Sequence, residues 1–152
     1  MSQSHIQATP MKTSLYEWIA RLLPSRADTA SPRFRIFNIT RQTEIGNSIE
    51  AADQGTRRRK GLLGRSSLML GEGLWIVPCE AVHTFCMRFA IDLIYLDRRN
   101  RVVKIREDVG PWRVSGCLRA HSVVELPSGS IARTQTQRGD SVEFEPMSSA
   151  IS

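Results

Sequence analysis

The stretch from His83 to Asp97, which reads His-Thr-Phe-Cys-Met-Arg-Phe-Ala-Ile-Asp-Leu-Ile-Tyr-Leu-Asp, decides the fold of this chain. Its second half is rich in β-branched, aliphatic and aromatic residues, a composition typical of a buried strand. One carboxylate, Asp92, interrupts the apolar run. Because burying a carboxylate without partners costs several kcal/mol, the fold must supply hydrogen-bond donors, a cation or a solvent-filled cleft at that position.

A hairpin is expected directly around this strand. Ile91 to Leu96 and Arg101 to Arg106 are its two arms, and Asn100 in the connection can adopt the left-handed conformation that such a short loop needs. Runs of apolar or alternating residues predict the other strands. They lie at Arg33–Ile39, shortly before Glu50, at Leu74–Val77, at Val123–Leu126 and at Val142–Phe144.

Helical signals are few in the body of the chain. Asp53 to Leu63 suits one short helix, and the segment from Gly129 to Gly139 has room for a helical turn. Short strands separated by turns, with so little helix between them, predict a mainly β fold. We therefore expect a single antiparallel β-sandwich or distorted barrel instead of a parallel sheet with crossover helices.

The beginning of the chain has a different pattern from the rest. Leu15, Trp18 and Leu22 fall on one face of an amphipathic helix that ends before Pro24. This helix is expected to pack on its own domain, with docking to a partner or contact with a membrane surface as alternatives. The expected parts are residues 1–32 as helical appendage and linker, residues 33–146 as the β domain, and residues 147–152 as a C-terminal tail.

The 152 residues carry a formal net charge of +6, and the isoelectric point is near 9.9. Such a length fits one domain, and the positive charge favours anionic partners. No apolar run approaches the ~20 residues that a membrane-spanning helix needs. The first residues also lack the continuous apolar core of a secretory signal peptide, so a cytoplasmic location is expected.

Several short motifs stand out along the chain as a set. They are Gly61-Leu62-Leu63-Gly64-Arg65, Gly71 with Gly73, Met87-Arg88 before Asp92, Val124-Glu125-Leu126-Pro127 with Gly129, and Gly139-Asp140. Together they resemble the family numbered 192 among bacterial and archaeal domains of unknown function, over roughly residues 35 to 145. The stretch from His83 to Phe89 is similar to one variant of that family.

The resemblance implies a compact, mainly β domain and no particular reaction, cofactor or partner. Three positions depart from the family pattern. Leu63 stands where methionine is more usual, Ala90 replaces a common proline, and Cys86 replaces glycine or an aromatic residue. Cys86 is therefore expected to serve in packing.

A polar pocket is the first hypothesis for a functional site, because ionisable groups withdrawn from water tend to have shifted pKa values. Asp92 shares a strand face with Ile94, and Glu125 shares one with Val123, so both carboxylates are expected to be withdrawn from water. The alternative is structural: Asp92 forms an ion pair or accepts backbone N–H bonds that hold a loop. The predicted binding residues are Arg65, His83, Arg88, Asp92 and Glu125.

The expected function is that of a non-enzymatic accessory or binding module, whose partner is an unknown small molecule or protein and which needs no cofactor. A competing hypothesis is a small enzyme in which Asp92 and Glu125 act as an acid and base pair. The two differ in geometry, because an acid and base pair must face each other across an open cavity.

The three cysteines, Cys79, Cys86 and Cys117, are expected to be free thiols in a reducing compartment. Their spacing does not match a strong zinc pattern, so no metal site is predicted. A nucleophile built from Cys79 and His83 lacks an evident orienting group. A bridge between Cys79 and Cys117 stays open as an alternative for an exported protein.

Much of the positive charge is concentrated in two places. These are the run Arg57-Arg58-Arg59-Lys60 and the hairpin tip at Arg98 and Arg99. Because no stacking aromatic residues are interleaved with these charges, a solvated basic face is expected and nucleic acid is not the expected partner. A basic surface that binds nucleic acid or an acidic protein is the remaining alternative.

Overall fold

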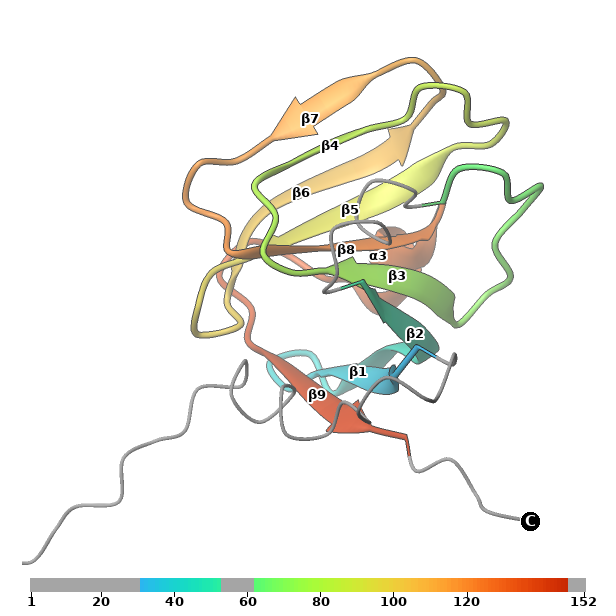
Figure 1. Cartoon of the computed structure of the whole chain (residues 1–152). Coiled ribbons are helices and arrows are strands. Elements are labelled where there is room, and N and C mark those ends of the chain that lie inside the picture. The colour runs from blue at the N-terminus through green and yellow to red at the C-terminus, as the bar shows by residue number, and fades with distance from the viewer. Residues whose placement is uncertain (1–30, 53–61, 148–152) are drawn as a thin grey trace, which may run out of the picture. The chain divides into compact units, whose positions relative to one another are not determined.

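The computed structural model of the chain describes residues 31–52 and 62–147 (Figure 1). Outside these residues lie the predicted N-terminal helix, residues 148–152 of the predicted C-terminal tail, and all but the last two residues of the helix predicted from Asp53 to Leu63.

The described residues contain nine strands and one short helix, and these elements confirm the mainly β prediction. The strands are β1 (Arg33–Asn38), β2 (Thr43–Ala52), β3 (Glu72–Ile76), β4 (Ala81–His83), β5 (Ile91–Leu96), β6 (Val102–Val109), β7 (Val114–Gly116), β8 (Ser122–Pro127) and β9 (Val142–Pro146), with the helix α3 (Ser130–Thr134) before β9. Seven strands form one sheet in the order β6-β5-β8-β3-β2-β1-β9. Only the pairing of β2 with β3 is parallel in this sheet. That pairing was not predicted, and it needs the long connection between Ala52 and Glu72.

The two edge strands of the large sheet, β6 and β9, meet at one end of their length. Arg101 and Ser141 form an isolated bridge there. The Val102 N–H donates to the Asp140 carbonyl at 2.9 Å, and the Val142 N–H donates to the Asn100 carbonyl at 3.0 Å. The sheet therefore curls into a partial barrel, as expected from the sequence, and covers part of two edges that would otherwise be open to pairing.

Each face of the large sheet carries its own apolar layer. On the first face, which we call the Trp75 face, Trp75 packs against Phe34 and Phe144 with ring centroids 5.4 and 4.2 Å apart. On the opposite face, the Tyr95 face, Tyr95 belongs to a buried cluster with Leu74 and other residues. A strand that is buried on both faces has an almost continuously apolar sequence, and this explains the composition of β5.

A small two-stranded sheet of β4 and β7, which we call the ribbon, covers part of the Tyr95 face (Figure 1). Val82 of the ribbon points into the buried cluster, and the Lys104 ammonium donates to the Gly116 carbonyl at 2.6 Å. The sequence did not predict these strands. Each has only three residues, so neither shows a period that could be recognised.

The predicted hairpin and helical turn are both present. Asn100 has a φ of 57°, and the Asp97 side chain accepts the N–H groups of Arg99 and Arg101 at 2.8 and 3.0 Å. These bonds hold the connection between β5 and β6 in a tight turn. The helix α3 lies inside the segment from Gly129 to Gly139, as predicted.

Candidate functional site

Asp92 is fully buried on the Trp75 face, and both of its oxygens are occupied by backbone donors. Oδ1 accepts the N–H of Asp108 in β6 at 2.9 Å, and Oδ2 accepts the N–H of Ile131 in α3 at 2.8 Å. Backbone N–H groups are therefore the partners that the sequence required for this carboxylate. Asp92 holds β6 and α3 to the central strand β5, and its oxygens are not exposed to a ligand.

Glu125 is only 4% exposed, and it lies in β8 between two leucines of neighbouring strands, Leu74 and Leu93. Its Oε2 atom has no hydrogen-bond partner among the described residues. Burial raises the pKa of Glu125 to about 7. The carboxyl can therefore be neutral at a pH where an exposed glutamate is ionised.

The strand register separates the two carboxylates. Asp92 is paired with Leu126, whereas Glu125 is paired with Leu93. Because successive side chains of a strand point to opposite faces, Asp92 lies on the Trp75 face and Glu125 on the Tyr95 face. The acid and base pair proposed for an enzyme is therefore not formed, and no water or substrate can lie between the two groups.

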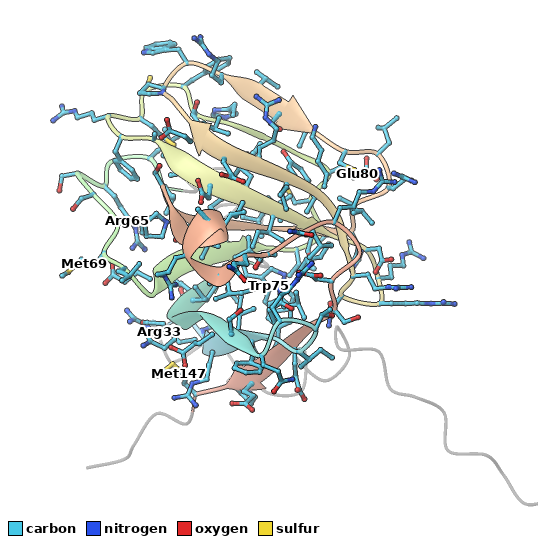
Figure 2. All side chains as sticks on the ribbon, turned by 180° about the vertical axis from the view of Figure 1, so that it is seen from behind. Arg33, Arg65, Met69, Trp75, Glu80 and Met147 are labelled. Carbon is cyan, nitrogen blue, oxygen red and sulfur yellow. The ribbon has the colours of Figure 1, made fainter. Side chains whose placement is uncertain are left out.

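Arg65 forms a salt bridge with Glu50, in which Arg65 Nη2 donates a hydrogen bond to Glu50 Oε2 at 2.8 Å. Burial alone would raise the pKa of Glu50, but the Ser31 hydroxyl and the Arg65 guanidinium outweigh it and lower that pKa. Figure 2 shows Arg65 and Glu80, which precedes β4, on opposite sides of the view. Arg65 pairs with Glu50, and Asp92 and Glu125 lie on opposite faces of the sheet, so the structure does not bring all five predicted site residues together.

His83 belongs to a stack of three rings at the surface. Its imidazole lies 5.0 Å from the ring of Phe85, with 26° between the planes, and Phe85 lies 5.8 Å from Trp112. Phe85 is 40% exposed and Trp112 is 62% exposed. Sequence reasoning missed both aromatic residues, because Trp112 is far from Phe85 along the chain and only the pairing of β4 with β7 brings them together.

Thr84 holds the two loops that carry these rings. Its side chain is buried, and its hydroxyl donates to the Gly110 carbonyl at 2.7 Å and accepts the Arg113 N–H at 2.9 Å. The Trp112 N–H donates to the Thr84 carbonyl at 3.0 Å. The stack is therefore fixed by backbone hydrogen bonds on both sides of the ribbon.

The outward side of the ribbon continues the apolar surface of the stack. His83 is paired with Val114, which is 66% exposed, and Ala81 is paired with Gly116. We call this surface the ribbon face, and it consists of Ala81, His83, Phe85, Trp112 and Val114. Exposed apolar side chains that lie next to one another are less common on a protein surface than single ones.

Arginine side chains lie beside the ribbon face in the sequence. Arg88 follows Phe85 by three residues, and Arg113 separates Trp112 from Val114. Both are exposed, and neither forms a salt bridge with a described residue. The ribbon face is thus apolar, and each of the two loops that carry its aromatic rings also has an exposed arginine nearby in the sequence.

The cysteines form no metal centre in the part of the chain that the structure describes, where no three potential ligands of the His, Cys, Asp or Glu types cluster. Cys79 and Cys117 are partly buried and Cys86 is exposed, and no disulfide bond joins any of these described cysteines. The Cys79 thiol donates to the Ala81 carbonyl at 3.2 Å. The described residues also contain no helix that is long and apolar enough to cross a membrane.

Fold and site together define a mainly β domain with an exposed aromatic ribbon and no pair of reacting carboxylates among its described residues. Residues 37–144 match the model of domain of unknown function 192, described as "Uncharacterized ACR". The chain belongs to this family, as its motifs suggested. It is similar to UPF0127 protein PF1050 of Pyrococcus furiosus, with 31% identity over 118 residues that cover 74% of this chain and 99% of the relative.

Two crystal structures share the fold. A proposed transcription regulator from Sinorhizobium meliloti superposes with a TM-score of 0.67 at 18% identity, covering 77% of this chain and 97% of that one. A protein of unknown function from Novosphingobium aromaticivorans gives a TM-score of 0.64 at 20% identity, covering 80% and 98%. At these identities the likeness concerns the fold alone, and the family carries no established activity.

Proposed function

We propose that the protein is a non-enzymatic binding module, and that it binds another protein through the ribbon face. The observation that supports this proposal most is the exposed stack of His83, Phe85 and Trp112. Large aromatic side chains contribute most of the energy in many protein interfaces, because they bury much apolar area at little cost in side-chain entropy.

The backbone at the stack supports a binding role. Trp112 has a φ of 60° and Cys86 has a φ of 62°, a conformation that side chains of this size rarely adopt. The hydrogen bonds of Thr84 hold these loops in that conformation. A surface that is rigid before binding loses less entropy when it binds, which favours affinity.

The charges next to the ribbon face indicate the chemistry of the partner. Arg88 and Arg113 are exposed cations without an acidic partner among the described residues. The chain as a whole carries a net charge of +6. We therefore expect a partner segment with aromatic or aliphatic residues at its centre and acidic residues at its edge. We retain the cytoplasmic location as part of this proposal, because cysteines without disulfide bonds are typical of a reducing compartment.

A peptide selection tests the proposal. The full chain is immobilised and used to select linear peptides from a displayed random library. We expect enriched peptides that contain aromatic and acidic residues and that bind Trp112→Asn at least about tenfold more weakly, because a buried tryptophan contributes on the order of 2 kcal/mol. Asparagine suits the replacement because it tolerates the left-handed backbone at this position.

Met69→Ser is the matched control, because Met69 is an exposed apolar residue that precedes β3 and is not part of the ribbon face. Its affinity for the selected peptides should equal that of the wild type. If no peptide is enriched, or if the enriched peptides bind Trp112→Asn as tightly as the wild type, the ribbon face is not a protein-binding surface.

Single-stranded nucleic acid is the second candidate, because the stack lies next to arginine residues and bases stack on such rings. Exposed Glu80 and Glu107 lie near the ribbon in sequence, and they repel the evenly spaced charges of a phosphate backbone more than a peptide whose few acidic residues can lie beside Arg88 and Arg113. A fluorescent oligothymidine measures this alternative in the same buffer. Binding at physiological salt that Trp112→Asn abolishes would assign the ribbon face to nucleic acid and overturn the protein partner.

A further inference from the structure

Three connections of the described domain meet at one end of the large sheet, and Figure 1 shows them on the same side of the view. They are residues 97–101 between β5 and β6, residues 117–121 between β7 and β8, and residues 137–141 before β9. The His121 N–H donates to the Leu96 carbonyl at 2.7 Å, and the Gly139 N–H donates to the Val102 carbonyl at 2.8 Å. Backbone hydrogen bonds therefore fix the second and third connections to the two strands that the first one joins.

Each of these connections carries at least one exposed arginine side chain. The sequence showed only the cluster at the hairpin tip, and the fold adds arginines that lie far from it along the chain. We call this surface the arginine end, and it consists of Arg98, Arg99, Arg101, Arg119 and Arg138. None of the five forms a salt bridge with a described residue. Their guanidinium groups can therefore bind an anion from outside the domain.

The acidic residues of these connections do not neutralise the arginine end. The Asp97 side chain accepts two backbone N–H groups of the hairpin turn, and Asp140 is paired with Arg41. Glu80, which lies next to the second connection, is exposed. Five arginine charges thus stand against the two carboxylates of Asp97 and Glu80, so the local charge is positive.

An apolar side chain is exposed at the same end. Leu118 is 90% exposed and directly precedes Arg119. The Ala120 N–H donates to the Cys117 carbonyl at 2.9 Å, so Leu118 and Arg119 occupy the two central positions of a tight turn. Binding to an anionic bilayer combines burial of apolar groups among the lipids with attraction of basic residues to the head groups. The tip of this turn offers both.

We propose that the arginine end binds the phosphate head groups of an anionic lipid bilayer, with Leu118 inserted among the lipids. Guanidinium groups form paired hydrogen bonds with phosphate oxygens, which favours arginine at such a surface. Duplex nucleic acid is the competing partner, but a phosphate backbone gives no apolar contact to an exposed leucine. The three connections also contain no Phe, Tyr or Trp that could stack on single-stranded bases. No residue of the ribbon face belongs to this surface, so the proposal does not depend on what that face binds.

Vesicle sedimentation with the full chain tests this proposal. Mixed vesicles of phosphatidylglycerol and phosphatidylcholine should bind the protein at physiological salt, whereas vesicles of phosphatidylcholine alone should not. The triple variant Arg98→Gln/Arg99→Gln/Arg119→Gln should bind the mixed vesicles at least about tenfold more weakly, because each basic residue near an anionic surface contributes to binding. Higher salt should weaken the binding of the wild type.

Two further variants separate this surface from the net charge of the chain. Arg33→Gln/Arg35→Gln/Arg106→Gln is the matched control, because it removes the same three charges from exposed strand residues outside the arginine end. It should bind the mixed vesicles far more tightly than the variant of the arginine end. Leu118→Ser keeps every charge and should weaken binding at least about threefold, because it removes the apolar group that enters the lipids.

Three results would overturn the proposal: no sedimentation with the mixed vesicles, equal affinity of the two triple variants, or wild-type affinity of Leu118→Ser. All the substituted residues are exposed, and equal melting temperatures of the variants and the wild type would show that folding is unchanged. A fluorescent DNA duplex is titrated in the same buffer. Duplex binding that the variant of the arginine end loses, without binding to vesicles, would assign this surface to nucleic acid instead.

Discussion

Glu125 and Leu126 are neighbours in β8, and their side chains enter different faces of the same sheet. At the scale of single residues, this alternation decides what each acidic group can do. Asp92 receives two backbone N–H bonds, whereas the Oε2 atom of Glu125 receives none from the described residues. Two carboxylates that look alike in the sequence thus differ in hydrogen bonding and in the cost of ionisation.

The raised pKa of Glu125 predicts a pH-dependent stability. The folded state holds this proton up to about pH 7, whereas the unfolded chain releases it near 4.5. Since the folded state binds more protons between these values, its unfolding free energy should fall by up to about 1.4 kcal/mol per pH unit as the pH rises from about 4.5 to about 7. Urea unfolding of the wild type and of Glu125→Gln across this window measures the effect.

Glu125→Gln should lack this decline, so the difference between the two curves is the measured quantity. Glu143→Gln serves as control, because Glu143 is an exposed carboxylate of β9, and its curve should run parallel to that of the wild type. Parallel curves for Glu125→Gln and the wild type would contradict a buried, protonated Glu125.

At the scale of elements, short segments are held to the central strands by single side chains. Asp92 joins β6 and α3 to β5, and Thr84 joins the two loops next to the ribbon. The helix α3 has only five residues, which is too short to be stable by itself. Such segments therefore depend on a buried acceptor that satisfies their free N–H groups.

Asp92→Asn should destabilise the protein by about 2 to 4 kcal/mol. The asparagine amide group would place a donor against one of the two backbone N–H groups that Asp92 accepts, which leaves a buried donor without a partner. Urea unfolding at neutral pH measures the loss, and faster hydrogen exchange at the Asp108 and Ile131 amides would show where it acts.

A partly exposed aspartate that accepts backbone hydrogen bonds provides the comparison. Asp97→Asn changes a turn at the surface and should cost about 1 kcal/mol or less, because water can replace the lost bonds. An equal decrease in unfolding free energy for Asp92→Asn and Asp97→Asn would mean that burial does not determine how much Asp92 contributes to stability.

At the scale of the whole molecule, the curled sheet is completed by a polar network between its first and last segments. The Asn38 amide of β1 donates to Asp140 Oδ2 at 2.9 Å, and the Gln137 N–H donates to the same oxygen at 2.9 Å. Arg41 forms a salt bridge with this carboxylate. Asp140 of the Gly139-Asp140 motif therefore links the start of the domain to its end through hydrogen bonds and a salt bridge.

Asp140→Ala should lower the unfolding free energy by about 2 kcal/mol at neutral pH, because it removes one acceptor of the buried Asn38 amide and the acceptor of the part-buried Gln137 N–H. Burial would raise the pKa of Asp140, but the Asn38 bond, the Gln137 N–H and Arg41 outweigh it and lower that pKa. Stability from this group is therefore present above the unfolded pKa of 3.8 and is lost as the pH falls through the lower folded pKa.

Urea titrations at about pH 7 and at progressively lower pH test this contribution of Asp140 to stability. The difference between Asp140→Ala and the wild type should shrink in the acid range. Glu145→Ala removes an exposed partner of Arg35 in β9 and should change stability by less than about 0.5 kcal/mol. A pH-independent difference for Asp140→Ala would argue against ionised Asp140 as the stabilising form.

Local patterns determined much of this fold in advance. The mainly β class, the hairpin with left-handed Asn100 and the helical turn before Gly139 follow from residue type and spacing, because turn chemistry and strand period act over a few residues. The burial of Asp92 and Glu125 also followed from their apolar neighbours. These features need no knowledge of which segments meet across the molecule.

The tertiary structure alone decided the rest. Whether two carboxylates share a face depends on the register of β5 against β8, and a shift of one residue would reverse the answer. The stack of Phe85 and Trp112 depends on the pairing of β4 with β7, two strands too short to leave a period in the sequence. Contacts between distant segments are set by packing of the whole chain, and local sequence carries no direct record of them.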